Sequence, residues 1–128
     1  MGERLKDKVA LVTGAGSSGP GWGNGKATAV LFAREGARVC VIDINRDAVE
    51  ERAGIIRDEG GDCLVDQVDV TDAEQVAAVV AKCMDHWGRV DILHNNAAIS
   101  PFGDPVTLDE ADWDRTFAVN VKLSLIHI

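Results

Sequence analysis

Residues 9–25 read VALVTGAGSSGPGWGNG, and this stretch decides the fold. It begins as an apolar run suited to a buried strand, and the glycines that follow let the backbone turn sharply and come close to a ligand. A second apolar run ends on Asp43, about 20 residues further on, which is the spacing of a dinucleotide-binding unit. The helix start after Gly25 would offer unpaired N–H groups to a pyrophosphate, and the Asp43 carboxylate would accept the ribose hydroxyls.

Asp43 also bears on which dinucleotide is bound. A carboxylate at this position would repel a 2′-phosphate by a few kcal/mol at an effective dielectric constant of about 20. We therefore expect NAD rather than NADP. Taken alone, Asp43 also fits a loop or helix-capping carboxylate, but its place directly after residues 39–42 favours the ribose role.

Strand and helix signals alternate along the chain. Residues 9–13, 38–43 and 90–94 are near-continuous apolar runs, as in strands buried on both faces, whereas 63–68 is interrupted by polar residues and suits an edge strand. Three apolar stripes at helical spacing lie between or after them: Ala27, Val30 and Leu31; Val49, Ala53 and Ile56; and Val76, Val79, Val80, Cys83 and Trp87. This order predicts an α/β fold, a truncated Rossmann-type doubly wound parallel sheet of about four strands with flanking helices.

Two helix starts carry the pattern of a reciprocal capping box. Thr71 precedes Glu74, and Thr107 precedes Glu110, at the spacing in which the threonine caps the helix and the glutamate bonds back. We expect helices to begin near residues 72 and 108.

Composition limits the class of protein. The 128 residues suit one domain, with 46% hydrophobic and 27% charged residues, and the formal net charge of −8 disfavours nucleic acid or an anionic membrane surface as partner. The N-terminus alternates charges and no apolar run is long enough to span a membrane, so we expect a cytoplasmic protein. Three separated cysteines, Cys40, Cys63 and Cys83, predict buried side chains rather than a disulfide framework or a metal site.

Several motifs together resemble one family, the short-chain dehydrogenases/reductases. The order of its motifs is reproduced by Thr13-Gly14, Gly23-Asn24-Gly25, Asp43, Asp69-Val70, Asn95-Asn96-Ala97-Ala98 and Asn120. The similarity runs from about residue 8 to residue 122. It implies an NAD-dependent enzyme that oxidises a secondary alcohol or reduces a ketone by hydride transfer, with a small-molecule substrate and a homo-oligomeric full-length protein.

The resemblance also implies residue roles. The pyrophosphate would be bound by Gly14, Ala15, Gly16, Ser17, Gly23, Asn24 and Gly25, and the adenosine ribose by Asp43. Asp69 would reach the adenine amino group while Val70 packs on its ring, although Asp69 also fits a capping or solvated acid beside Thr71. Asn96 and Ala97 would lie along the nicotinamide, and Asn95 would brace the fourth strand. Asn120 would order a water in the family's proton relay, or be simply a polar helix residue.

The sequence departs from the family pattern in the glycine-rich segment and beside the asparagines. Residues 18–22 lengthen the phosphate loop, so which glycine touches which phosphate oxygen stays open, and Trp22 fits either a hydrophobic plug or a cover over the cofactor. Ala98 replaces the family's last glycine, a change that keeps the side chain small. We interpret His94, where an aliphatic residue is commoner, as a hydrogen-bonded core histidine rather than a catalytic one.

The family's catalytic Ser, Tyr and Lys cannot be placed in this chain, which contains no tyrosine. Because acid–base catalysis of this kind contributes about 10²- to 10⁴-fold to the rate, the chain by itself is expected to be inactive. Two alternatives are a non-catalytic dinucleotide-binding module that senses redox state and a methyltransferase-like Rossmann domain. Residues 69–70 and 95–97 argue against the second.

The last six residues, LSLIHI, read as one frame of a common transposon-end sequencing adapter. We therefore expect residues 1–122 to be an incomplete NAD(P)-binding Rossmann domain and residues 123–128 a non-native tail, with a natural apolar helix continuation as the alternative.

Overall fold

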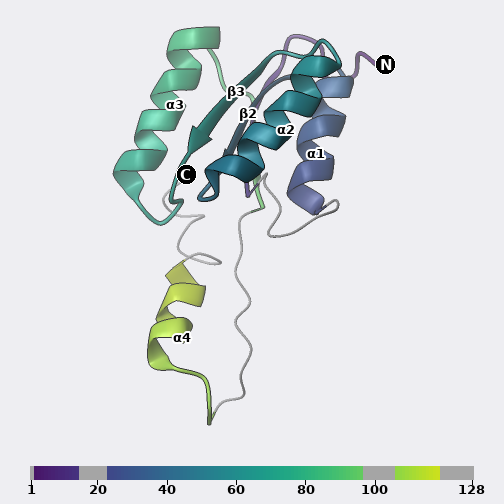
Figure 1. Ribbon diagram of the computed structural model, residues 1–128. Coiled ribbons are helices and arrows are strands. Elements are labelled where there is room, and N and C mark those ends of the chain that lie inside the picture. Colours follow the sequence, from purple (N-terminus) through teal and green to yellow (C-terminus); the bar gives the residue numbers. More distant parts are fainter. Residues whose placement is uncertain (1, 15–22, 97–105, 119–128) are drawn as a thin grey trace.

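The computed structural model describes residues 2–14, 23–96 and 106–118. In these ranges the strands β1 (Val9–Thr13), β2 (Arg38–Asp43), β3 (Cys63–Gln67) and β4 (Ile92–Asn95) form one parallel sheet in the order β3-β2-β1-β4. The helices are α1 (Asn24–Arg34), α2 (Arg46–Asp58), α3 (Ala73–Trp87) and α4 (Glu110–Phe117). Figure 1 shows the alternation of strand and helix that the sequence predicts.

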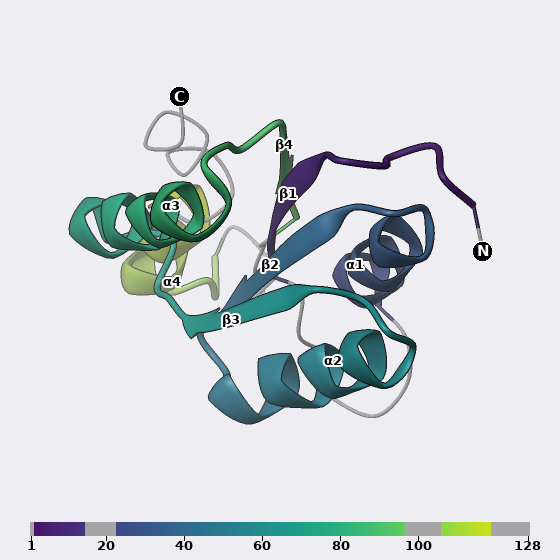
Figure 2. The same cartoon turned by 90° about the horizontal axis from the view of Figure 1, so that it is seen from above.

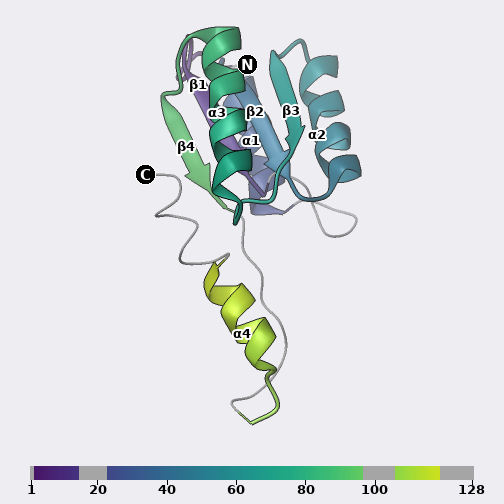
Figure 3. The same cartoon turned by 90° about the vertical axis from the view of Figure 1, so that its left-hand side faces the viewer.

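The sheet is the middle of three layers. Helices α1 and α2 cover one face and α3 covers the other (Figure 2). The side chains of β1 and β2 alternate between two cores, so that Val12, Val39 and Val41 pack with α1 and α2, whereas Leu11 and Ile42 pack with α3. Helix α4 lies beyond the carboxyl ends of the strands and has no buried residue (Figures 1 and 3). None of the helices in the described ranges is long and apolar enough to cross a membrane.

The predicted doubly wound parallel sheet is confirmed, and β3 lies at the edge as its polar interruption indicates. Val49, Ala53 and Ile56 are fully buried on α2, and burial of each larger apolar side chain contributes about 1.5–3 kcal/mol to the free energy of folding.

Two of the predicted helical stripes need correction. In the first, only Val30 is buried, Leu31 is 51% exposed and Ala27 is exposed as well, because α1 turns Gly25, Lys26 and Ala29 inward instead. In the third, Val76, Val79 and Cys83 are buried, but Val80 is exposed.

The predicted capping residues are wrong by one or two positions. Helix α3 begins at Ala73, and the side chain of Asp72 caps it by accepting hydrogen bonds from Glu74 N (3.0 Å) and Gln75 N (3.3 Å). Helix α4 begins at Glu110 and is capped by Asp109. The physical reason is that an ionised carboxylate is a stronger acceptor than a hydroxyl and also complements the positive end of the helix dipole. Thr71 is therefore not the cap, and neither is Thr107.

The predicted fourth strand, residues 90–94, lies instead at Ile92–Asn95. Pairing with β1 begins where Ile92 faces Ala10, and Val90 packs against the core on the α3 side. Just before this pairing, Asp91 and Val9 exchange two hydrogen bonds: Val9 N donates to Asp91 Oδ2 (2.9 Å) and Asp91 N donates to Val9 O (2.9 Å). The Arg89 guanidinium donates two hydrogen bonds to the Asp91 carboxylate, at 2.8 and 2.6 Å, and so holds it in place. The Asp91 side chain therefore starts the β1–β4 pairing.

The other end of this strand pair is closed by a junction of four residues. The hydroxyl oxygen of Thr13 accepts a hydrogen bond from Asn96 N (3.0 Å), and Asn96 Nδ2 donates to Gly14 O (3.1 Å). Gly14 has a φ of 64°, the left-handed region that favours glycine. A Cβ added to Gly25 would collide with the Gly14 carbonyl oxygen and with the Asn96 amide, so the start of α1 lies directly against this junction.

We predict that Gly25→Ala destabilises the protein by about 1–3 kcal/mol, because the methyl group must displace backbone rather than a flexible side chain. Urea unfolding followed by circular dichroism measures the change. The matched control is Gly54→Ala on α2, where an added Cβ meets nothing within 4 Å and the variant should gain about 0.5–1 kcal/mol. Equal stability of Gly25→Ala and the wild type would contradict the close packing of this junction.

A second prediction concerns acid stability. The Arg89 guanidinium and the Val9 amide hold the pKa of Asp91 below its ordinary value. A carboxyl group whose pKa is lower in the folded than in the unfolded state stabilises the fold above the unfolded pKa, and this contribution is lost as pH falls through the folded pKa. Asp91→Asn should therefore flatten the loss of stability between about pH 5 and pH 2. Urea midpoints across that range, compared with the exposed control Asp85→Asn, test it, and identical pH profiles for the two variants would rule it out.

Candidate functional site

The carboxyl ends of the strands meet along one edge of the sheet (Figure 3). The chain leaves β1 to one side toward β2 and later returns to the other side of β1 as β4, so the strand order reverses between β1 and β4. In open parallel sheets such a reversal opens a crevice outside the strand ends, where ligands bind. The predicted site residues that the structure describes lie at this edge, either in the connections or at the adjoining ends of β2 and α1: Gly14, Gly23, Asn24, Gly25, Asp43, Asp69, Val70 and Asn96.

The start of α1 differs from the other helix starts in the described ranges. Helices α2, α3 and α4 are each capped by a side chain, from Asn45, Asp72 and Asp109, and each has an acidic residue in its first turn. Helix α1 has Gly23 as its N-cap, without a side-chain hydrogen bond, and no acidic residue in its first turn. Its first amide groups and the positive end of its dipole are thus not neutralised by a local carboxylate, which suits an anionic group.

Sequence reasoning missed two cations beside this helix start. Lys26 in the first turn of α1 is 5% exposed and Arg52 on α2 is 1% exposed. Both approach the carboxylate of Glu51, with Lys26 Nζ 3.4 Å and Arg52 Nη1 3.9 Å from Oε1. Burial lowers the pKa of Arg52. The signal available in the sequence was the position of Lys26 directly after Gly25, where a lysine adds positive charge to the dipole of the helix start.

Asp43 lies at the carboxyl end of β2, half-buried. Its Oδ1 accepts a hydrogen bond from Asn45 N (2.9 Å), and its backbone carbonyl accepts one from Val68 N (3.0 Å). Asn45 in turn caps α2, so the segment that carries Asp43 is held from both neighbouring elements. The Asp43 carboxylate can accept hydrogen bonds from hydroxyl groups of a ligand. Its bond with Asn45 N also stabilises the turn between β2 and α2.

Asp69 lies between β3 and α3. Its Oδ1 accepts hydrogen bonds from Thr71 Oγ1 (2.7 Å) and Thr71 N (3.0 Å), and these lower the pKa of Asp69. An ionised carboxylate only accepts hydrogen bonds, so Asp69 can serve a ligand as an acceptor. Val70 is 7% exposed and packs with Val68 and Val76, so most of its side chain is covered by the core on the α3 side.

The asparagine pair ends β4. Asn96 bonds Thr13 and Gly14 as described above, which ties this segment to the first strand and the glycine turn. His94 on β4 is half-buried with its ring edge-on to Phe32, 6.3 Å between ring centroids. Its buried Nε2 has no hydrogen-bond partner among the described residues, so the hydrogen bond expected of a core histidine is not made by that atom; the ring packs as an aromatic group instead.

Other predicted site residues lie outside the described residues. They are Ala15, Gly16 and Ser17 of the glycine-rich segment, Ala97 after β4, and the proposed relay residue Asn120. The same holds for the loop insert with Trp22, for Ala98 and for the tail at 123–128.

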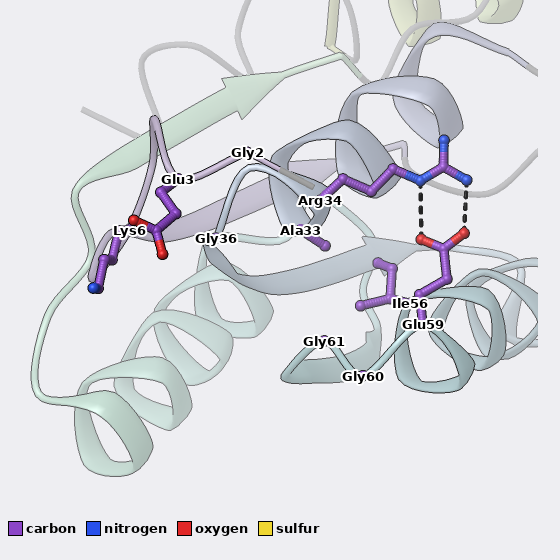
Figure 4. A pocket seen from close by; sticks show the side chains of 10 residues that line it. All are labelled: Gly2, Glu3, Lys6, Ala33, Arg34, Gly36, Ile56, Glu59, Gly60 and Gly61. Atoms are coloured by element: carbon purple, nitrogen blue, oxygen red, sulfur yellow. Dashed lines mark hydrogen bonds and ion pairs between the residues drawn. The ribbon is translucent and has the colours of Figure 1, made fainter.

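The opposite edge of the sheet carries a hollow of about 240 Å³ between the N-terminal segment and the carboxyl ends of α1 and α2 (Figure 4). Its charged lining includes Arg34 and Glu59, which form a bidentate pair with distances of 2.9 and 2.6 Å. This pair lowers the pKa of Glu59, and the two charges neutralise each other. The hollow therefore offers a ligand no uncompensated charge from this pair.

The predicted burial of the three cysteines is confirmed: Cys40, Cys63 and Cys83 are buried, and their thiols are free. Burial raises the pKa of the Cys63 thiol to about 12, so this group is an inert thiol at neutral pH. In the part of the chain that the structure describes, no group of three or more His, Cys, Asp or Glu side chains could hold a metal ion.

Comparisons with known proteins agree with this geometry. A family model described as short chain dehydrogenase matches residues 8–127. An uncharacterized oxidoreductase of Thermotoga maritima is 45% identical over 119 residues, which cover 92% of this chain and 44% of the relative.

Solved structures give the same result. A short-chain dehydrogenase/reductase from Burkholderia xenovorans has a TM-score of 0.93 at 44% identity, covering 98% of this chain and 50% of that one. NAD+-bound xylitol dehydrogenase has a TM-score of 0.86 at 33% identity, covering 97% of this chain and 46% of that one. This chain thus spans about half the length of the relatives it matches. It belongs to the short-chain dehydrogenase/reductase family of oxidoreductases.

Proposed function

We propose that this chain is the coenzyme-binding part of an NAD-dependent oxidoreductase that transfers hydride between a small secondary alcohol or ketone and the nicotinamide. One observation carries the proposal: the start of α1, which follows β1 and has no side-chain cap, and the Asp43 carboxylate, which ends the neighbouring strand β2, lie at the same edge of the sheet. The helix start suits a pyrophosphate, and the carboxylate suits the paired hydroxyls of the adenosine ribose.

The other proposed residues follow the strands on either side: Asp69 and Val70 come after β3, and Asn96 and Ala97 come after β4. Asp69 would accept a hydrogen bond from the adenine amino group, with Val70 beside the ring. Asn96 and Ala97, which follow β4, would line the nicotinamide side, and Asn120 would order a water in the proton relay. The glycine turn from Gly14 through Ser17 and from Gly23 to Gly25 would hold the pyrophosphate. The NAD+-bound relative of similar fold supports this choice of ligand.

The residues fit such a ligand in their chemistry. The start of α1, which has no acidic residue in its first turn, offers the positive end of its dipole where two phosphate groups would lie, and Asp43 and Asp69 supply acceptors where hydroxyl and amino donors would lie. The nicotinamide supplies the hydride chemistry when the coenzyme is bound. What this chain contributes is binding, orientation and the choice of coenzyme.

We propose the substrate class from the names of similar proteins. The similar xylitol dehydrogenase acts on a polyol by its name, which supports a hydroxylated carbon compound as substrate. The composition and the three free, buried cysteines support a location in the cytoplasm.

We predict that the chain binds NADH at least about tenfold more tightly than NADPH, because Asp43 would repel the 2′-phosphate. Asp43→Asn should raise the dissociation constant for NADH about 10- to 100-fold and reduce the preference over NADPH, since the ribose hydroxyls lose a charged acceptor. NADH fluorescence titration and calorimetry measure both constants. Asp47→Asn, the same change at an exposed position on α2, is the control and should bind both coenzymes as the wild type does. Tighter binding of NADPH than NADH by the wild type would contradict the role of Asp43.

We also predict that these 128 residues bind NADH without turning over alcohols or ketones. The chain contains no tyrosine to exchange a proton with the substrate oxygen. Steady-state absorbance of NADH with a panel of polyols and ketones tests this, and turnover above the buffer rate would show that another group performs the proton transfer.

A further inference from the structure

The segment that carries Asp69 is held by side chains of its own helix start. Thr71 donates two hydrogen bonds to the same carboxylate oxygen, Oδ1, from its hydroxyl at 2.7 Å and its backbone amide at 3.0 Å. Among the described residues nothing donates to the other oxygen, Oδ2. Because each carboxylate oxygen can accept about two hydrogen bonds, Thr71 occupies one side of the group and leaves the other available.

The backbone at Asp69 is fixed by a different residue. Asp69 N donates to Gln75 Oε1 (2.8 Å), while Gln75 Nε2 donates to Asp72 Oδ2 (3.0 Å). The second oxygen of Asp72 caps α3. These two contacts fix the orientation of the Gln75 amide, because its oxygen accepts from the Asp69 amide and its nitrogen donates to the Asp72 carboxylate. Through it, the Asp69 peptide is tied to the first turn of α3.

We propose that Thr71 and Gln75 are positioning residues: they fix the Asp69 carboxylate with Oδ2 available as an acceptor, and so make the site select a 6-amino purine over a 6-oxo purine. This inference rests on the proposed binding of a nicotinamide dinucleotide. An ionised carboxylate accepts a hydrogen bond from the amino group of adenine but opposes the carbonyl oxygen of hypoxanthine. A freely rotating or protonated carboxyl group would discriminate less, because it could turn away or donate.

The electrostatic surroundings of Asp69 agree with this role. The hydrogen bonds from Thr71 lower the pKa of Asp69, and Arg115 of α4 acts in the same direction more weakly. Asp72, the N-cap of α3, also lies close by, since Asp72 N donates to Asp69 O (3.0 Å), but its own carboxylate accepts hydrogen bonds from Gln75 and from the amides of the helix start. Loss of the Thr71 hydroxyl would therefore raise the pKa of Asp69 toward its ordinary value.

The test compares reduced nicotinamide adenine dinucleotide with reduced nicotinamide hypoxanthine dinucleotide by fluorescence titration of the whole chain. The wild type should bind the adenine form at least about tenfold more tightly. Thr71→Val, which keeps the shape but removes the hydroxyl, should weaken binding of the adenine form about tenfold and leave the hypoxanthine form nearly unchanged. Thr71→Ser should restore the preference, and Gln75→Leu should reduce it.

Two further measurements separate positioning from simple loss of structure. Thr116→Val removes a threonine hydrogen bond on α4 (2.6 Å to Asp112 O) and should keep the wild-type preference. In Thr71→Val the weakening of NADH binding at low pH should begin at a higher pH than in the wild type, because the carboxylate is protonated sooner. A Thr71→Val or Gln75→Leu variant with normal circular dichroism and an unchanged preference for adenine would overturn the inference.

The same titrations distinguish this inference from the function on which it rests. A wild type that binds both dinucleotides equally well would overturn the inference and leave coenzyme binding intact. A wild type that binds neither dinucleotide would overturn the proposed function, and the inference with it.

Discussion

The parallel pairing of β1 with β4 is the interaction on which the candidate site depends. At one end it is started by the exchange between Val9 and Asp91, and at the other it is closed by Thr13 and Asn96. Because Asn96, which directly follows β4, also binds the Gly14 carbonyl, the end of this pairing holds the first residue of the glycine turn. Loss of the hydrogen bonding between β1 and β4 would separate the glycine turn from the segment proposed to face the nicotinamide. The core on the side of α1 and the core on the side of α3 would each keep most of their buried residues.

Charge is distributed unevenly along the carboxyl edge of the sheet. Capping carboxylates neutralise the starts of α3 and α4, and Asn45 caps α2, whereas the start of α1 has a glycine cap and a buried lysine. A buried ammonium in the first turn of a helix opposes the helix dipole and costs free energy, which the nearby Glu51 offsets in part. In a chain with a net charge of −8, the start of α1 therefore stands out by having no acidic residue in its first turn, and the proposed pyrophosphate would lie there.

In the connection between β3 and α3, the local sequence pattern predicted a helix start but assigned the wrong capping residue. The capping box predicted Thr71 as the helix cap, yet Asp72 takes that role and the Thr71 hydroxyl bonds Asp69. Both threonine and aspartate are favoured caps, and the choice between them depends on which donors and acceptors the neighbouring strand brings within reach. Similarly, the apolar positions of α1 suggested Leu31 as a core residue, but the close approach of Gly25 to the junction rotates the helix so that Lys26 faces inward.

The sequence by itself determined the architecture and the type of site. Buried strands need continuous apolar runs, a left-handed turn at residue 14 needs glycine, and an acid that ends the second strand is a local feature, so each of these can be read without coordinates. Only the tertiary structure decided which groups meet. The contacts of Asn96 with Thr13 and Gly14, of Lys26 with Glu51, and of Val9 with Asp91 join residues brought together by the sheet and its helices. Such contacts depend on strand register and helix rotation, which are set by the packing of the whole core and not by the residues on either side of one position.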